Sequence, residues 1–174
     1  MTEAHYSIRS AHADELPQIQ AIEKAAAQRF RNTVDAWIAD DDGMALESLT
    51  HWLLHGRIWV AVDAQDKPVG FVVAHEIDSM AYIHELDVAP AHGRQGLGRR
   101  LIETVAVWGR TCGYPALLLS TFVDIPWNAP YYQRLGFRRL DEAELGVGLQ
   151  AIREQEAAAG LDLTRRVCML RLIE

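Results

Sequence analysis

The stretch Pro90-Ala-His-Gly-Arg-Gln-Gly-Leu-Gly-Arg-Arg100 decides the fold of this chain. It follows an apolar run, Tyr82 to Val88, that is typical of a strand. It leads into apolar residues at helical spacing, namely Leu97, Leu101, Val105 and Trp108. A turn of this kind can point several backbone N–H groups at one spot, where the start of the helix adds partial positive charge. The stretch therefore predicts a site for a phosphate group.

Glycines and arginines give this turn its chemistry. A glycine has no side chain to hold a phosphate away, and it tolerates a positive φ. An arginine adds a cationic, fork-shaped donor. The glycines are Gly93, Gly96 and Gly98, and the arginines are Arg94, Arg99 and Arg100. A plain strand-to-helix turn is the competing interpretation, but it would have little need of so many glycines beside basic residues.

A second motif lies downstream, at Asn128-Ala-Pro-Tyr-Tyr-Gln-Arg-Leu-Gly-Phe137. Together the two motifs resemble the GNAT superfamily of N-acetyltransferases, whose acyl-CoA pyrophosphate loop reads Q/R-x-x-G-x-G/A and whose later segment reads N-x-P-(F/L)-Y-x-x-L-G-F. Gly96 and Gly98 fill the two glycine positions of the loop. Gly93 stands where the family has Gln or Arg, which removes one side-chain contact but leaves a backbone N–H. The resemblance is good from Arg57 to Phe137 and weaker elsewhere.

The resemblance implies a mixed α/β sheet with helices on both faces. In the family, two central strands splay apart and the pantetheine arm of acetyl-CoA lies between them; here these strands would be Met80–Val88 and Ala116–Val123. Unpaired backbone groups on such strands can bind the amides of the arm. The residues expected to contact the acetyl-CoA co-substrate are Leu86, Asp87, Val88, Gly93, Arg94, Gln95, Gly96, Leu97, Gly98, Arg99, Asn128 and Tyr132. Asn128 is also expected to cap the short helix that follows it.

Amine acetylation needs a base, and the strand before the turn offers two candidates. Glu85 lies in a Glu-Leu-x-Val context like that of the family strand, where an acidic residue often deprotonates the amine. His84 is the competitor, because an imidazole with a pKa of about 6.5 suits the task. Adjacent strand residues face opposite sides, so only one should face the site unless a bulge intervenes. An ion-paired Glu85 and a satisfied core His84 are the structural alternatives.

Tyr132 is the candidate acid for the thiolate leaving group. The family places a tyrosine hydroxyl near the CoA sulfur at this position, five residues before Phe137. A tyrosine with a pKa of about 10 is protonated at neutral pH and can donate a proton. A packed aromatic side chain is the alternative. Tyr131 would point about 100° away on a helix, so both tyrosines cannot hold the sulfur.

The acceptor side carries weaker signals. The segment between the first two helices holds Trp37 and Asp40-Asp41-Asp42, which could select a cationic amine. A solvated acidic loop is the simpler interpretation. Trp127 precedes the short helix, close to where an acceptor would lie.

Apolar periodicity predicts a β-α-α-β-β-β-α-β-α-β-α-β order. Asp14 is the expected N-cap of the first helix. The apolar stripe of this helix consists of Leu16, Ile19, Ile22, Ala26 and Phe30. Glu142–Ala159 is expected to be mostly helical, with Gly146 and Gly148 weakening its start. A chain of 174 residues without repeat or linker predicts a single domain, 1–174.

Bulk composition narrows the function classes. The net charge of −7 argues against non-specific nucleic-acid binding, which needs a basic face. Cys112 and Cys168 form no metal-ligand spacing, and both are interpreted as reduced small side chains. Met1-Thr-Glu-Ala-His5 resembles no signal peptide, and no apolar run is long enough to cross a bilayer. We expect a cytoplasmic protein that uses no metal and does not act at a membrane.

The sequence leaves two main functions open. The first is acetyl-CoA-dependent N-acetylation of an amine by direct attack in a ternary complex, since no motif supports a cysteine nucleophile. The second is a GNAT-fold module that binds acyl-CoA and catalyses little, which the Gly93 departure favours. A nucleotide-binding domain is a weaker third, because the chain has neither a Walker lysine nor a G-x-G-x-x-G turn. The poorly matched residues after Phe137 could form a homodimer contact.

Overall fold

The computed structural model describes residues 5–174. Residues 1–4, on which the expectation of no signal peptide partly rests, lie outside the described residues. The chain divides into two compact units. Unit 1 runs to His75 and includes Glu85–Thr104, whereas unit 2 comprises Glu76–His84 and Val105–Glu174. The single-domain expectation stays a prediction, and each unit is described by itself.

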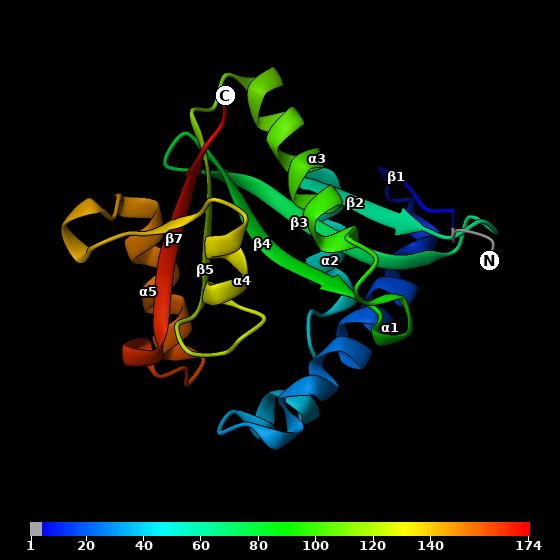
Figure 1. The fold of residues 1–174 in the computed structure, drawn as a ribbon, viewed down its shortest axis with the longest axis horizontal. Coiled ribbons are helices and arrows are strands. Elements are labelled where there is room, and N and C mark those ends of the chain that lie inside the picture. The colour runs from blue at the N-terminus through cyan, green and yellow to red at the C-terminus, as the bar shows by residue number, and fades with distance from the viewer. Residues whose placement is uncertain (1–4) are drawn as a thin grey trace. The chain divides into compact units, whose positions relative to one another are not determined.

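Five α-helices and seven strands account for most of residues 5–174, joined by short 3₁₀ turns (Figure 1). The helices are α1 Leu16–Ala27, α2 Leu46–His55, α3 Leu97–Cys112, α4 Ala129–Arg134 and α5 Val147–Ala158. The strands are β1 Ser7–Ser10, β2 Arg57–Val62, β3 Pro68–Ile77, β4 Met80–Val88, β5 Ala116–Phe122, β6 Arg138–Arg139 and β7 Arg166–Leu172. The predicted order of elements is confirmed.

The strands form a mixed sheet in the order β1-β2-β3-β4-β5-β7-β6. Its one parallel pair within the described residues joins β4 to β5, where Ala81 faces Leu117 and Tyr82 faces Leu118. The pairs β1–β2, β2–β3, β5–β7 and β6–β7 are antiparallel. Strands β3 and β4 each contribute residues to both units. The mixed sheet expected from the sequence is therefore present.

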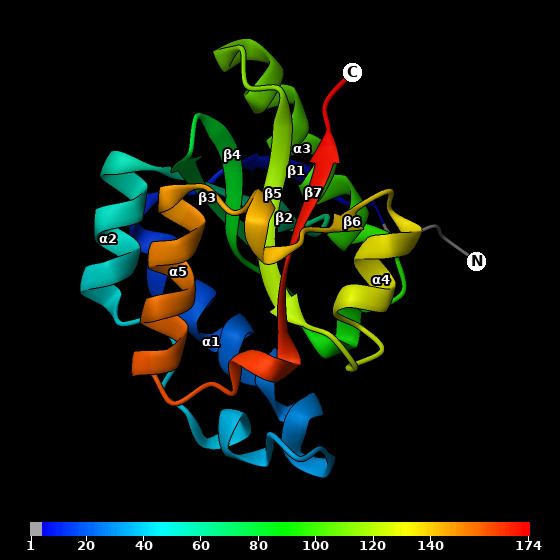
Figure 2. The same cartoon turned by 90° about the vertical axis from the view of Figure 1, so that its left-hand side faces the viewer.

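Unit 1 has a core between α1, α2 and the strands β2 and β3. Leu16, Ile19 and Ile22 of the α1 stripe pack with Leu49 of α2. The strands supply Ile58, Val60, Val62, Phe71 and Val73. Figures 1 and 2 show both helices on the same face of these strands. The helical spacing seen in the sequence therefore identified the buried face of α1.

Unit 2 has its own core between α5 and the strands β5 and β7. Leu149 of α5 packs with Tyr82, Leu118 and Cys168, and Figure 2 shows α5 to the left of these two strands. All seven residues of β5 pair with β7, from Ala116 opposite Leu172 to Phe122 opposite Arg166. The run Leu117–Leu119 is buried throughout, as expected for a strand covered on both faces.

One local prediction was wrong. Asp14 does not cap the first helix: it lies inside a 3₁₀ turn, Ala13–Glu15, whose N-cap is His12. There the Glu15 carboxylate accepts the His12 N–H at 2.8 Å, so the chain turns one step earlier than the apolar stripe implies.

The prediction that Glu142–Ala159 is mostly helical is confirmed. The 3₁₀ turn Glu142–Glu144 is followed by α5, which begins at Val147.

Asp78, in the β3–β4 turn, explains why two glycines stand at the start of α5. Its carboxylate accepts the N–H of Gly148 at 2.7 Å and of Leu149 at 3.1 Å. A Cβ on Gly146 would lie 2.5 Å from Asp78 Oδ2, and one on Gly148 would lie 2.5 Å from Ile77 Cγ2. Glycine is a poor helix former, but these two glycines let the Asp78 carboxylate approach and accept the first N–H groups of α5.

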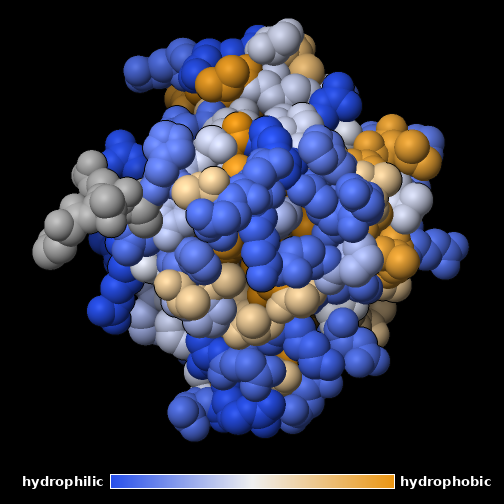
Figure 3. Space-filling view, turned by 90° about the vertical axis from the view of Figure 1, so that its right-hand side faces the viewer, coloured by the Kyte–Doolittle hydropathy of each residue, from blue (hydrophilic) through white to orange (hydrophobic). Residues whose placement is uncertain are grey.

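Within residues 5–174, every helix is too short or too polar to cross a membrane. The face drawn in Figure 3 is mostly hydrophilic, and hydrophobic side chains occur on it in small, separate groups.

We predict that Asp78→Ala destabilises the protein by about 1–2 kcal/mol, because two N–H groups at the start of α5 lose their acceptor. Asp78→Asn keeps one acceptor oxygen and should cost about half as much. Urea unfolding measures both. The control is Glu154→Ala, which removes an exposed carboxylate on α5. It is expected to change the free energy of unfolding by less than about 0.5 kcal/mol. Equal effects of Asp78→Ala and Glu154→Ala would show that the cap contributes nothing.

Candidate active site

The turn between β4 and α3 has the bare backbone that the sequence predicts. A 3₁₀ turn, Pro90–His92, follows β4, and α3 starts at Leu97. Gly96 has a φ of +72° and Arg94 a φ of +60°. A positive φ costs glycine little but strains an arginine, and such strain is concentrated at functional sites. The first N–H groups of α3 have no partner within the helix, so they are open to an anion.

The sequence did not reveal what holds this turn in place. The Tyr6 hydroxyl hydrogen-bonds His92 Nδ1 at 2.9 Å, and Arg100 donates to the Tyr6 carbonyl oxygen at 2.9 Å. The Ala89 N–H donates to the Val69 carbonyl oxygen at 2.8 Å. The turn is therefore tied to the start of β1 and to β3 within unit 1. No sequence motif marks Tyr6, because these contacts join residues 86 and 94 positions apart.

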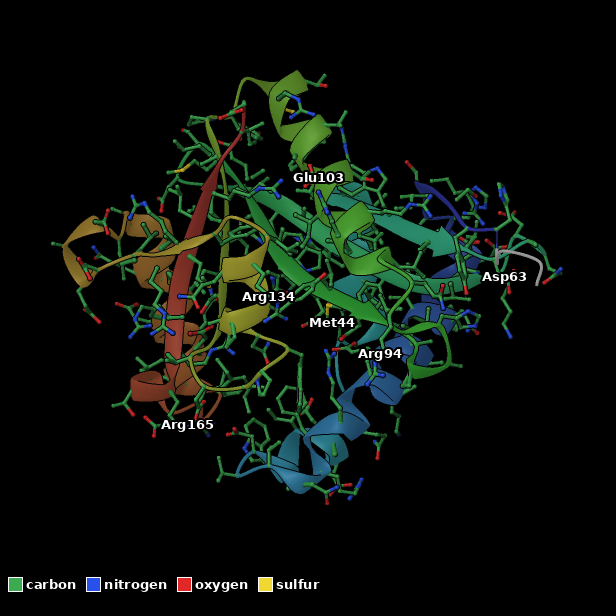
Figure 4. All side chains as sticks on the ribbon, in the orientation of Figure 1. Met44, Asp63, Arg94, Glu103, Arg134 and Arg165 are labelled. Atoms are coloured by element: carbon green, nitrogen blue, oxygen red, sulfur yellow. The ribbon has the colours of Figure 1, made fainter. Side chains whose placement is uncertain are left out.

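The predicted loop residues differ in what they can offer. Arg94, Gln95, Gly96 and Arg99 are exposed, and Arg94 is labelled in Figure 4. Gly93 and Gly98 are half-buried, and the Gly93 N–H is bound to the Pro90 carbonyl oxygen at 3.2 Å. Leu97 is buried, so only its backbone could contact a ligand. The backbone role expected of Gly93 is weakened by this internal hydrogen bond.

The end of β4 carries a buried carboxyl. Asp87 is only 7% exposed, and its Oδ1 lies 3.1 Å from the Arg29 guanidinium. Burial raises the pKa of Asp87 well above its usual value; the facing charge of Glu85 adds to the rise, while Arg29 opposes it. The side chain of Asp87 is thus committed to neighbours within unit 1. Leu86 and Val88, its half-buried neighbours, remain candidates for backbone contacts.

Glu85 and Asp87 act as a pair. They are two positions apart on β4, so their side chains lie on the same face of the strand. Burial raises the pKa of Asp87, and the charge of half-buried Glu85 adds to the rise. The two carboxyls thus oppose each other's ionisation.

A third carboxyl, Glu23 of α1, belongs to the same group. Burial raises the pKa of Glu23 to about 7, and the facing charge of Glu85 adds to the rise. Both Glu23 oxygens accept the Met44 N–H, at 3.2 and 3.0 Å. Sequence reasoning missed Glu23 and Arg29. The available signal was position: Glu23 follows Ile22 and lies one turn from Ile19 and Ala26, at the edge of the buried stripe.

The other candidate base, His84, belongs to unit 2. It is half-buried, and its ring lies edge-on to Tyr82 with the ring centroids 6.4 Å apart. Tyr82 is part of the unit 2 core. The ring contact with Tyr82 favours the interpretation of His84 as a core histidine, whereas Glu85 lies among ionisable groups.

Asn128 stands at the N-cap position of α4, but its side chain does not cap the helix. Its Nδ2 donates instead to Thr121 Oγ1 at 2.8 Å. Its Oδ1 is buried and has no hydrogen-bond partner within the described residues. A buried oxygen without a donor is costly, so this atom is suited to accept an amide N–H from a ligand.

Tyr132 is half-buried on α4, with its ring edge-on to Phe137 at a centroid distance of 5.7 Å. The Phe137 N–H closes the turn on the Tyr132 carbonyl oxygen at 3.1 Å, where Gly136 has a φ of +90°. Tyr131, the alternative, carries the Arg134 guanidinium 5.8 Å from its ring centroid. The L-G-F end of the motif thus fixes the helix that carries Tyr132.

Most of the acidic run before α2 has local roles. Asp40 pairs with Arg31 at 2.8 Å, which lowers the pKa of Asp40. Asp41 accepts the Gly43 N–H at 2.8 Å. Trp37 is 47% exposed. These contacts favour the solvated-loop interpretation of Asp40–Asp42 over direct selection of an amine.

The two cysteines differ in their exposure to solvent. Cys168 is buried, and burial raises the pKa of its thiol, so its nucleophilic thiolate is disfavoured. Cys112 is exposed at the end of α3. Among residues 5–174, no group of three or more metal-ligating side chains is placed to hold an ion.

Solved structures with the same fold are numerous. An acetyltransferase of the GNAT family from Staphylococcus aureus Mu50 aligns with a TM-score of 0.75 at 17% identity, over 98% of this chain and 100% of that one. N-acetylglutamate synthase from Neisseria gonorrhoeae, complexed with coenzyme A and N-acetyl-glutamate, aligns with a TM-score of 0.73 at 18% identity, over 99% of this chain and 36% of that one. PaiA N-acetyltransferase from Thermoplasma acidophilum, in complex with coenzyme A, aligns with a TM-score of 0.70 at 14% identity, over 97% of this chain and 99% of that one.

The fold and the glycine turn thus define an acetyltransferase of the GNAT class. The model of the Acetyltransferase (GNAT) family matches residues 18–137, which contain both sequence motifs. The chain belongs to this family, and it is an acetyltransferase.

We predict that Glu23→Gln stabilises the protein at high pH. The folded-state pKa of about 7 exceeds the ordinary 4.5, so the wild type loses stability as pH rises through this window. The variant carries no charge to desolvate, and its advantage should grow from near zero at pH 4 to about 2–3 kcal/mol at pH 8.

Urea unfolding across this pH range measures the effect. Glu154→Gln, an exposed glutamate on α5, is the control and should show no such trend. If the difference in stability between Glu23→Gln and the wild type is the same at pH 4 and pH 8, the burial of the Glu23 charge is contradicted.

Proposed function

We propose that the protein transfers the acetyl group of acetyl-CoA to an amine by direct attack in a ternary complex. The observation that carries the proposal is the position of Glu85 and Asp87 near the end of β4, directly before the glycine turn. One strand would thus present a carboxylate base and lead into a phosphate-binding turn. A module that only binds acyl-CoA has no need of two neighbouring carboxyls at this place.

Glu85 is the proposed base. An ordinary alkylamine has a pKa of about 10, so making it neutral at pH 7 costs about 4 kcal/mol. Because the Asp87 side chain is bound to Arg29, we assign to Glu85 the acceptance of a proton from the amine, and a positioned base contributes about 10²–10⁴-fold in rate. The amine nitrogen forms its bond to the acetyl carbonyl carbon as the carbon–sulfur bond breaks.

Tyr132 is the proposed acid. The thiolate that leaves needs a proton or a donor, and a phenol with a pKa of about 10 is protonated at working pH. The end of α4 supports this role, because the chain turns at Gly136 and the Phe137 N–H donates to the Tyr132 carbonyl oxygen, which fixes the helix end that carries Tyr132. No cysteine is needed, and the raised pKa of buried Cys168 agrees with direct transfer.

The chain also offers groups that fit the acetyl-CoA co-substrate. The start of α3, where the first N–H groups have no partner within the helix, is suited with Arg94 and Arg99 to the pyrophosphate. The orphaned Oδ1 of Asn128 is suited to an amide N–H of the pantetheine arm. The co-substrate supplies the activated thioester, and these residues bind and orient it.

A thiol-release assay with acetyl-CoA tests the function. The amine panel spans polyamines, amino acids, aminoglycosides, arylalkylamines and peptide N-termini. Release of free thiol with one class would support the enzyme and name its acceptor. Silence across the panel, with acetyl-CoA still raising the melting temperature, would favour the binding module. No thermal shift at all would contradict acetyl-CoA binding.

We predict that Glu85→Gln lowers kcat by about 10²-fold or more and moves the pH profile upward, because the amine must then lose its proton unaided. The KM for acetyl-CoA should stay within about threefold of wild type. His84→Gln is the matched variant on the same strand, and it should keep most of the activity. A large loss in His84→Gln with little change in Glu85→Gln would transfer the role of base to His84.

A further inference from the structure

Gly43 leaves the space that the Glu23 carboxylate occupies. Glu23 lies on α1, and Gly43 approaches it from the segment before α2. A Cβ on Gly43 would lie 2.8 Å from the Glu23 carboxyl carbon, and Gly43 has a φ of +70°. A side chain at position 43 would therefore be both strained and in collision with the carboxylate.

Two side chains of α1 hold both backbone groups of Met44, which is labelled in Figure 4. Glu23 accepts its N–H, and Gln20 Nε2 donates to its carbonyl oxygen at 3.0 Å. Gln20 and Glu23 are three positions apart and so share a helix face. Gln28 Nε2 adds a third contact, to the Ala39 carbonyl oxygen at 2.8 Å. Polar side chains of α1 and of the turn after it thus hold the segment 33–45, and Met44 also packs against the apolar core of unit 1.

The same carboxylate faces the paired carboxyls of β4. Glu85 opposes the ionisation of Glu23, and Glu23 in turn opposes that of Asp87. Asp41, in the fastened segment, also faces Glu23. Arg29 is the cation of the group and binds Asp87. Glu23 thus hydrogen-bonds the segment, and its charge acts on the carboxyls of β4.

We propose that Glu23 is a positioning residue: it holds segment 33–45 on α1 through Met44, and its charge acts on the Glu85–Asp87 pair, so that attachment of the segment and protonation of the pair are linked. This inference rests on the proposed function for its catalytic half. A charged acceptor of an N–H bond is stronger than a neutral one, so ionised Glu23 holds Met44 more tightly. Any change that removes negative charge from the β4 pair favours this ionised, fastened form.

The charge of Glu23 is unfavourable for folding, since a glutamine could accept the same N–H without a buried charge. Ionised Glu23 also makes it harder for the β4 pair to ionise, because like charges face each other. The residue therefore places the ionisation of the proposed base closer to neutral pH. A base whose proton affinity lies nearer the working pH is the more effective one.

The first test needs no activity. The Met44 amide is followed by ¹⁵N NMR from pH 5 to 9 in wild type, Glu23→Gln and Glu23→Ala. We expect its chemical shift to titrate near pH 7 in the wild type, and not in Glu23→Gln, where the amide stays protected. In Glu23→Ala the amide should exchange about tenfold faster or more. Gln28→Ala, which loosens the segment at Ala39, is the control and should keep the Met44 titration. A wild-type Met44 amide that does not titrate, or equal protection in Glu23→Ala, would overturn the proposal.

The second test uses the amine found active in the thiol-release assay. In Glu23→Gln the acid limb of kcat/KM should move to lower pH by about half a unit or more, because the β4 pair ionises more easily without the facing charge. The KM for acetyl-CoA should not change, since Glu23 is not among the residues that fit it. In Glu23→Ala the KM for the amine should rise about fivefold or more, as the segment loosens.

The outcomes separate the inference from the proposed function. If the wild type releases no thiol with any amine, the function fails, and the NMR titration still tests the link between Glu23 and Met44. If the wild type is active and Glu23→Gln has the wild-type pH profile, the positioning role is overturned and Glu23 is only a structural contact.

Discussion

The ion pair between Arg29 and Asp87 is the interaction on which the rest of the site depends. It joins Arg29, just after α1, to Asp87, the second-last residue of β4, with 3.1 Å between the charged atoms. The Arg29 side chain is 41% exposed, so the pair itself adds little net stability, but loss of Arg29 would leave the buried Asp87 carboxyl without its cation. Asp87 is 7% exposed and has two further carboxyls facing it, so Arg29 is what makes this concentration of acid tolerable.

From this pair the site is built outward along the chain. Asp87 and Glu85 lie on the same strand, the charge of Glu85 raises the pKa of Glu23, and Glu23 accepts the Met44 N–H. Carboxyls from α1 and β4, which are far apart in sequence, thus influence one another's ionisation. Such coupled groups titrate as a set, so the pH dependence of the enzyme should report on the cluster rather than on Glu85 alone.

The two units use the same device at different places: a carboxylate from one element satisfies backbone N–H groups of another, beside glycines that allow close approach. In unit 1 it is Glu23 with Met44 and Gly43. In unit 2 it is Asp78 with Gly148 and Leu149. Gly148 is unfavourable by helix propensity and is explained by the close approach of Ile77 and Asp78, whereas Gly43 is favoured both by its positive φ and by the approach of Glu23.

The sequence by itself determined the elements, their order, the buried stripe of α1 and the glycine turn, because these follow from local periodicity and from motifs contained in short windows. Tertiary structure alone decided which charged groups meet. Glu23, Arg29 and Tyr6 carry no motif, and their partners lie 21, 58 and 86 residues away. It also decided that Asn128 reaches Thr121 instead of capping α4 and that Asp40 pairs with Arg31. Periodicity reports which face of an element is buried, whereas the pKa of a carboxyl depends on everything packed around it.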